Sequence, residues 1–191
     1  MQAVDAIDPI DPETIVNRFY PIGSFARDLL LHHGELVAGK AFRILDQAPW
    51  IDADREFVNQ AAMLHDIGMV RTRTPQLGCR GELPYVCHGV EGRAMLDALE
   101  LSHHALVCER HVGVGIGIDQ IIQLNLPLPL RDMHPVSVEE RLICYADKFF
   151  SKNDNGRHEK NVDEILAHLK RYGEDATKAF IALHREFTRE S

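Results

Sequence analysis

The stretch AAMLHDIG, residues 61–68, decides the fold, because it places a histidine and an aspartate side by side in an otherwise apolar helical segment. A buried carboxylate is strongly disfavoured unless an ion pair or a bound cation compensates its charge. Imidazole nitrogens and carboxylate oxygens are also common ligands of divalent metals. The pair His65 and Asp66 therefore predicts either a buried ion pair or a metal site in the core.

Further side chains of the ligand type lie far from this pair in the sequence: His33, His88, His111 and Asp147. Hydrophobic periodicity over residues 24–47 places His33 on the inward stripe, and the helical period turns its neighbour His32 about 100° away. A predicted helix begins after Ser137, and Asp147 is a lone carboxylate on its apolar face. Taken singly, each would be an ordinary core residue, a cap or a surface ion pair, so only their joint occurrence favours a metal site.

The rest of the chain has a helical pattern, and no alternation typical of strands is sustained. We expect a loose acidic arm over 1–12, in which Asp11 caps the first helix and Pro12 begins it, followed by a single bundle over 13–191. Ser102 and Ser137 are predicted to cap later helices. The predicted helices cover about 24–47, 54–70, 88–100, 102–111, 137–150, 161–172 and 174–189, with proline- and glycine-rich loops at 71–87 and 124–136.

The composition narrows the classes of partner. The chain has 191 residues, with 21 Lys and Arg against 29 Asp and Glu, for a formal net charge of -8. This balance argues against a grip on the phosphates of a nucleic-acid polymer, although metal and local basic residues would still let the chain bind a small phosphorylated ligand. The four cysteines lack zinc-ribbon or redox spacing, no signal segment opens the chain, and no apolar run approaches the roughly 20 residues of a membrane span. We therefore expect a cytoplasmic protein with no membrane contact.

Five short segments around these candidate ligands, taken in order, resemble the HD superfamily of metal-dependent phosphohydrolases, and more closely its small HDIG-type members. The resemblance spans about residues 24–150, and the tail beyond Ser151 is more weakly similar to uncharacterised HDIG proteins. It implies an all-α HD-domain bundle with a metal site between core helices. The segments that carry it are HGELVA (33–38), LHDIG (64–68), HGVEG (88–92), ERHVG (109–113) and YADK (145–148).

In the resembling family, one metal is held by the positions matching His33, His65, Asp66 and Asp147. The positions matching His88 and His111 hold a second metal, and the Asp66-type carboxylate bridges the two. Ligands of these types suit iron, manganese, cobalt, nickel or zinc, without choosing among them. Two such cations would support hydrolysis of a phosphoester or phosphoanhydride through attack by metal-bound hydroxide. His65, Asp66 and Lys148 are the residues that we expect to act in catalysis.

One departure from the family pattern leaves the phosphate contacts open. HDIG proteins commonly carry a lysine after the motif's glycine, where this chain has Met69. The candidate substitutes are Arg71, Arg73, Arg110 and Lys148, and the glycine run 113–117 is either a flexible rim for the substrate or an ordinary loop. The expected substrate is a small nucleotide or a related phosphorylated metabolite. A non-catalytic sensor module that binds metal and nucleotide, an all-α scaffold whose histidines only pack, and a homodimer all stay open.

Overall fold

The computed structural model describes residues 10–154 and 158–189. The predicted acidic arm lies outside the described residues up to position 9. The elements, in chain order, are α1 (Pro12–Val16), α2 (Phe25–Gln47), α3 (Arg55–Leu64), η1 (Ile67–Arg71), β1 (Arg73–Thr74), η2 (Pro75–Leu77), β2 (Cys79–Arg80), η3 (Tyr85–Cys87), α4 (His88–Asp97), α5 (Ser102–Arg110), α6 (Ile118–Gln123), α7 (Val138–Asp147), η4 (Lys152–Asp154), α8 (Val162–Leu169), η5 (Lys170–Tyr172) and α9 (Glu174–Thr188).

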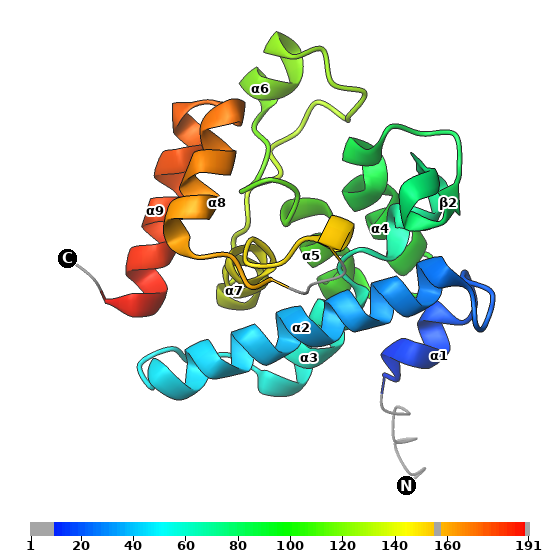
Figure 1. Cartoon of the computed structure of the whole chain (residues 1–191), viewed down its shortest axis with the longest axis horizontal. Coiled ribbons are helices and arrows are strands. Elements are labelled where there is room, and N and C mark those ends of the chain that lie inside the picture. Colours follow the sequence, from blue (N-terminus) through cyan, green and yellow to red (C-terminus); the bar gives the residue numbers. More distant parts are fainter. Residues whose placement is uncertain (1–9, 155–157, 190–191) are drawn as a thin grey trace, which may run out of the picture.

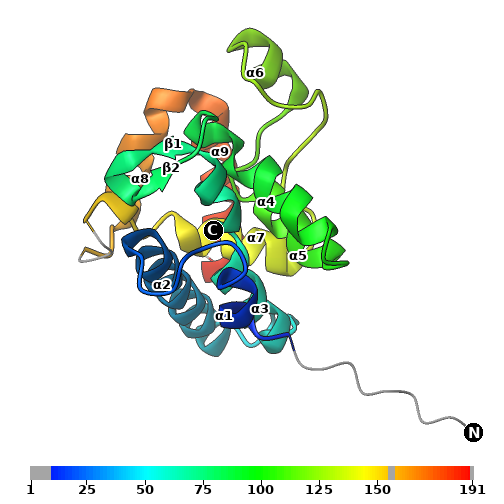
Figure 2. The same ribbon diagram turned by 90° about the vertical axis from the view of Figure 1, so that its right-hand side faces the viewer.

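The helices surround α7, which Figure 1 shows nearly end on in the middle of the molecule. The long helix α2 packs against α3 and α7, α5 packs against α4 and α7, and α9 covers another side of α7. Helix α6 stands away from the other helices (Figure 2). The all-α prediction is confirmed, because the sheet of the described residues is a single pair of two-residue antiparallel strands. None of the described helices is both long and apolar enough to cross a membrane.

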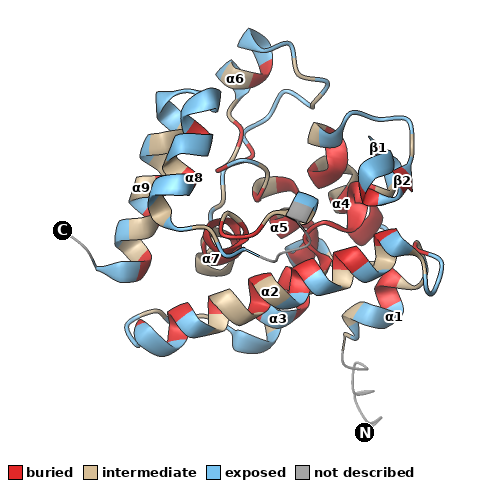
Figure 3. Ribbon diagram, in the orientation of Figure 1, coloured by how far each residue is buried: buried red, intermediate tan, exposed pale blue. Residues whose placement is uncertain are grey.

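Two large apolar clusters form most of the core, and a third, smaller one lies around Ile121 of α6. The helix faces that meet between the two large clusters are buried (Figure 3). One cluster joins the C-terminal half of α2 to α7, α8 and α9. The other joins α1 and the N-terminal half of α2 to η1, α4 and α5. On α2, Leu30 belongs to one cluster and Val37 to the other, and His33 lies between them on the same face. The polar side chains of the centre therefore lie at the junction of two apolar regions.

The predicted caps Asp11 and Ser137 are confirmed, since each side chain accepts hydrogen bonds from backbone N–H groups of the first turn. The prediction for Ser102 is wrong. Leu101 occupies the cap position without a side-chain hydrogen bond, and Ser102 is the first residue of α5.

The predicted continuous helix over 54–70 is also wrong. Helix α3 ends at Leu64, His65 is its C-cap, and a 3-10 turn begins only at Ile67. The buried hydroxyl of Tyr20 explains the break. It donates a hydrogen bond to the carbonyl of Ile67 at 2.9 Å and accepts one from the N–H of Val70 at 2.9 Å. Tyr20 thus satisfies two backbone groups of the turn, and Asp66 is left outside regular helix.

Three other helices end earlier than predicted. Helix α4 ends at Asp97, and Glu100 adopts a left-handed φ of 61° in the turn that follows. Helix α7 ends at Asp147 rather than at position 150. The predicted helix 161–172 is α8 followed by the 3-10 turn η5.

Candidate metal centre

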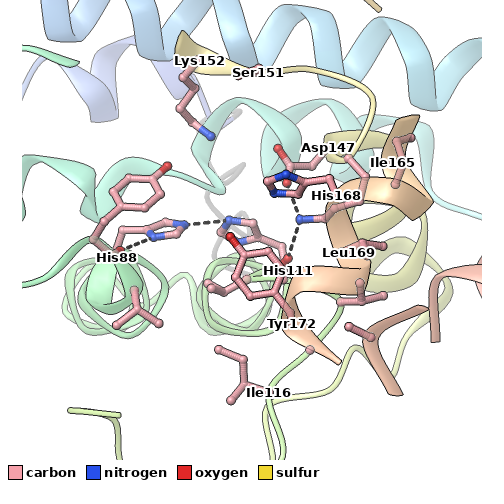
Figure 4. Close-up of a pocket in the computed structure, with 18 of the residues that line it drawn as sticks. His88, His111, Ile116, Asp147, Ser151, Lys152, Ile165, His168, Leu169 and Tyr172 are labelled. Atoms are coloured by element: carbon pink, nitrogen blue, oxygen red, sulfur yellow. Dashed lines mark hydrogen bonds and ion pairs between the residues drawn. The ribbon is translucent and has the colours of Figure 1, made fainter. Parts of the chain in front are cut away.

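The side chains nominated from the sequence as metal ligands all meet between the helices, and all are buried. Three of them are labelled in Figure 4. Ligation itself stays a prediction, but the placement that it requires is present. The contributions are His33 from α2, His65 and Asp66 after the end of α3, His88 at the start of α4, His111 after the end of α5, and Asp147 at the end of α7.

Asp66 belongs to two groups of potential ligand atoms, and each group lies within 4.8 Å. Its Oδ2 lies 3.1 Å from His65 Nε2 and 3.4 Å from His33 Nε2. Its Oδ1 lies 3.2 Å from His88 Nε2 and 3.4 Å from His111 Nε2. The first group also contains Asp147, whose Oδ1 lies 2.9 Å from His33 Nε2. The carboxylate of Asp66 therefore turns one oxygen toward each group, as a bridging ligand does.

Backbone carbonyls determine which nitrogen of three rings faces the centre. Each of these Nδ1 atoms lies against a carbonyl oxygen that can only accept a hydrogen bond, so Nδ1 carries the proton and donates it. In the neutral ring, Nε2 is then left with its lone pair directed into the cluster, which is the form that binds a metal. The pairs are His65 with Ala62 O at 2.6 Å, His88 with Tyr85 O at 2.6 Å, and His111 with Cys108 O at 2.8 Å.

The remaining contacts of the cluster fit bound cations. His88 Nε2 and His111 Nε2 face each other at 3.1 Å, and two lone pairs at that separation repel unless a cation lies near both. Among the described residues, His65 Nε2 and Asp66 Oδ1 are buried without a hydrogen-bond partner of good geometry, whereas Asp66 Oδ2 is paired with Lys152. Buried polar atoms without partners are costly and call for an ion or another ligand. The His and Asp donors therefore suit divalent metal ions.

Two lysines balance the carboxylates. Lys152 Nζ lies 2.5 Å from Asp66 Oδ2, and Lys148 Nζ lies 2.7 Å from Asp147 Oδ2. Burial alone would raise the pKa of both carboxyls, but these lysines and the histidines outweigh it, so the pKa of Asp66 and that of Asp147 lie well below the usual value. The carboxylates are thus ionised at neutral pH.

The same balance separates the histidines. Burial lowers the pKa of His33 to about 4 and that of His111 to about 4, because it penalises the charged ring more than the nearby carboxylates favour it. Burial also acts on His65, but Asp66 and Asp147 outweigh it and raise the pKa of His65 to about 9. Burial therefore leaves His33 and His111 neutral and able to act as ligands, whereas His65 would have to release a proton to bind a cation.

A cavity of about 650 Å³ opens onto the centre, within the range of small-molecule sites. His88, His111 and Asp147 form its floor, and Lys148, Lys152 and Lys160 also line it. Figure 4 shows Lys152 approaching from one side, while Ile165, His168, Leu169 and Tyr172 come from the C-terminal helices. Charged, polar and apolar side chains thus all line the cavity.

Of the four candidate phosphate contacts, the structure places one in the cavity. Lys148 lines the cavity, whereas Arg71 and Arg73 are exposed elsewhere and Arg110 forms a bidentate pair with Glu140 at 2.9 and 3.0 Å. Met69 is fully buried in an apolar cluster, so its position offers no group to a substrate. Gly113 and Gly115 have left-handed φ values of 65° and 87° and line the cavity, which places the predicted rim beside the centre.

Sequence reasoning missed two residues of the site. Lys152 follows the matched YADK segment by four residues, and that spacing was its one signal. The ring of Tyr85 stacks on His88, with centroids 4.4 Å apart and an interplanar angle of 21°. Tyr85 lies in a predicted loop, and nothing in the sequence pairs it with the histidine that follows three residues later.

The comparisons with known proteins place the chain in a family. The family model of the HD domain matches residues 30–152, and the chain belongs to the HD domain family. A second observation concerns individual relatives. The chain is 26% identical over 189 residues to an uncharacterised protein of Methanocaldococcus jannaschii, which covers 97% of this chain and 94% of that protein.

Two other relatives are longer proteins named tRNA (cytidine(56)-2'-O)-methyltransferase. The one from Picrophilus torridus is 31% identical over 127 residues, which is 66% of this chain and 33% of the methyltransferase. The one from Thermoplasma volcanium is 26% identical over 177 residues, which is 92% of this chain and 46% of the methyltransferase. The chain thus spans less than half the length of either methyltransferase. No solved structure matches this chain.

Proposed function

We propose that this chain is a dinuclear metal-dependent phosphohydrolase that cleaves a phosphoester or phosphoanhydride bond of a small nucleotide or phosphorylated metabolite. The observation that carries the proposal is the carboxylate of Asp66, which presents Oδ2 to His33 and His65 and Oδ1 to His88 and His111. A carboxylate shared by two groups of imidazole ligands supports two cations rather than one. When bound, such a pair supplies an activated water and charge stabilisation for displacement at phosphorus.

The chain's own residues would bind and orient the substrate. Lys148 and Lys152 line the cavity beside the centre, and their ammonium groups are held by Asp147 and Asp66. Burial lowers the pKa of Lys148, but Asp147 outweighs it and the pKa is raised, so the side chain keeps its charge. We assign to these two lysines the phosphate contact that Met69 does not supply. This pairing of fixed charges with phosphate oxygens is the main contribution that a protein makes to phosphoryl transfer.

We do not propose methyl transfer for this chain. Less than half of either protein is similar to it, and the matched family accounts for residues 30–152. The buried His and Asp groups instead support metal-dependent hydrolysis. The net charge of -8 favours a small ligand over a tRNA-sized polymer.

The test is product release across a panel of nucleotides and phosphoesters, each assayed with Mn, Fe(II), Co, Ni, Mg and Zn. Asp66→Asn keeps the size of the side chain and removes the bridging charge, so turnover should fall by at least about 10³-fold. His104→Gln is the matched control, because His104 is a buried histidine of α5 that contacts Gln60 outside the centre. Turnover that survives in Asp66→Asn would contradict the proposal.

The alternative is a sensor module that binds metal and nucleotide without turnover. The burial of Met69, where related proteins carry a phosphate-binding lysine, is the observation that favours it. It predicts saturable nucleotide binding that needs metal, and no product after long incubation. The same panel therefore separates the two functions.

A further inference from the structure

The cavity also has an apolar lining that the metal centre does not use. Ile116 and Leu126 lie on the segment that carries α6, and Ile165 and Leu169 lie on α8. These four residues are called the apolar wall. Ile165 and Leu169 are also buried members of the core cluster around α7, so this part of the wall is firmly placed. A substrate that fills the cavity would meet both charged groups and this apolar wall.

Two aromatic side chains line the cavity together with this apolar wall. His168 and Tyr172 lie one helical turn apart, with ring centroids 5.5 Å apart and planes inclined by 59°. Both side chains line the cavity, yet both are exposed, Tyr172 by 57%. In Figure 4 they enter from the C-terminal helices beside the labelled residues of the centre. Aromatic side chains with a polar group, such as Tyr, are enriched at binding interfaces.

The charge state of His168 suits contact with a neutral ring. Partial burial lowers its pKa, and the positive charges of Lys160, Arg171 and Lys148 lower it further. The ring is therefore neutral at physiological pH, and it can pack flat against another aromatic group. The ring therefore adds no positive charge to the cavity.

His168 and Tyr172 lie in the part of the chain beyond the match to the HD family model. The HD family model ends at residue 152, whereas α8, η5 and α9 begin at Val162. The candidate metal ligands and Ile116 and Leu126 of the apolar wall come from the matched part, whereas Ile165, Leu169 and the two aromatic side chains come from the unmatched part. Selection of the substrate can thus vary independently of the chemistry at phosphorus.

We infer that Tyr172 and His168 form a specificity site for the non-phosphate part of the substrate, and that this part is a flat aromatic group such as a nucleobase. The inference rests on the proposed function for the position of the phosphate at the metal centre. An aromatic group would stack on the two rings and cover the apolar wall. A polyhydroxylated group would bury its hydroxyls against Ile165 and Leu169 without hydrogen-bond partners, which is unfavourable.

The test compares AMP with ribose 5-phosphate, which share the sugar and phosphate and differ in the base. Binding of each to the metal-loaded chain is measured by equilibrium dialysis, and kcat and KM are measured separately. AMP should bind at least about 10-fold more tightly, the effect expected for one base stacked on aromatic side chains. 1-Naphthyl phosphate, an aromatic ester without ribose, serves as a second probe and should share the preference.

Variants then locate the preference. Tyr172→Ala should weaken AMP binding about 10-fold and leave ribose 5-phosphate unchanged, and Tyr172→Phe should retain most of the AMP affinity, because the ring stays. His168→Ala should act in the same direction. Phe25→Ala is the matched control, since Phe25 is 60% exposed and does not line the cavity. The expected change is confined to KM for the aromatic compounds.

The outcomes separate this inference from the proposed function. Tighter binding of AMP that depends on Tyr172, without turnover of any compound, would support the specificity site and refute the hydrolase. Turnover of both compounds with equal KM, unaffected by Tyr172→Ala, would support the hydrolase and overturn the specificity site. Failure of both aromatic compounds to bind more tightly than ribose 5-phosphate would also overturn it.

Discussion

Gly68 is the point at which the turn carrying Asp66 touches the helix carrying His88. A Cβ built on Gly68 would overlap the carbonyl oxygen of His88 and the backbone nitrogen of Gly92, and would lie 2.9 Å from Gly92 Cα. Optimal contacts between carbon atoms are about 3.5–4.0 Å. The obstructing atoms belong to the backbone and cannot rotate away, so Gly68→Ala must push η1 and α4 apart.

The size of the effect follows from this geometry. Overpacking a well-packed core costs typically about 1–3 kcal/mol, and obstruction by backbone places Gly68→Ala at the upper end, near 3 kcal/mol. Gly39→Ala is the same substitution on α2, where the nearest atom is the flexible Arg43 Nη1 at 3.7 Å. Alanine is better than glycine inside a helix by about 1 kcal/mol, so Gly39→Ala should stabilise the protein. The two variants should differ by about 4 kcal/mol.

Urea unfolding measures both free energies of unfolding, and metal analysis supplies a second readout. The separation of η1 from α4 moves Asp66 away from His88, so Gly68→Ala should lose the cation of the second ligand group before that of the first. A Gly68→Ala variant whose free energy of unfolding lies within 1 kcal/mol of that of the unmodified chain would refute the argument. So would a loss of stability shared equally by Gly39→Ala.

Three further predictions address the centre and its surroundings. Asp66→Asn should lose both cations, His88→Gln mainly one, and His104→Gln neither, which metal analysis after dialysis would check; equal metal content in all three would contradict the assignment. Lys152→Met should raise KM for a phosphorylated substrate by about 10-fold or more, since it removes a charge-assisted contact; an unchanged KM would exclude Lys152 from phosphate binding. His104 has a pKa lowered to about 4 by burial and by His103, so its neutral form contributes stability that is complete above the unfolded-state pKa of about 6.5 and is lost as the pH falls from there toward 4. After allowance for partial solvation, His104→Gln should reduce this acid-induced loss by about 1–2 kcal/mol, measured by urea unfolding at several pH values; an identical loss would contradict it.

The sequence predicted the centre better than the backbone around it. Helical periodicity was enough to choose His33, which is buried, over His32, which is exposed. The other members were identified through the resemblance to the HD family, because each of them taken singly is an ordinary core or capping residue. The break between α3 and η1 was not predictable in this way. It depends on hydrogen bonds from Tyr20, which lies 47 residues before Ile67.

The cavity was also beyond reach of the sequence, for a related reason. Part of its apolar wall is made by residues of α8, and the sequence of this helix has an ordinary amphipathic pattern. Periodicity does not reveal which face of such a helix stays uncovered by the rest of the protein. Lys152 presented the same difficulty, since a lysine in a short turn is usually solvated. Local patterns report which residues are buried, whereas the identity of the group that they meet depends on long-range packing.

The charges of the centre are compatible with the anionic substrate that we propose for this acidic chain. Asp66 and Asp147 are paired with Lys152 and Lys148, so the charges of the fixed carboxylates and ammonium groups cancel. Each divalent cation held by neutral imidazoles would then add its full positive charge to the floor of the cavity. A strong local field of one sign inside a cleft draws in a small phosphate, while the net charge of -8 repels an extended polyanion. Raising the ionic strength should therefore weaken capture of a small phosphorylated substrate only modestly, because buried charges are screened far less than exposed ones.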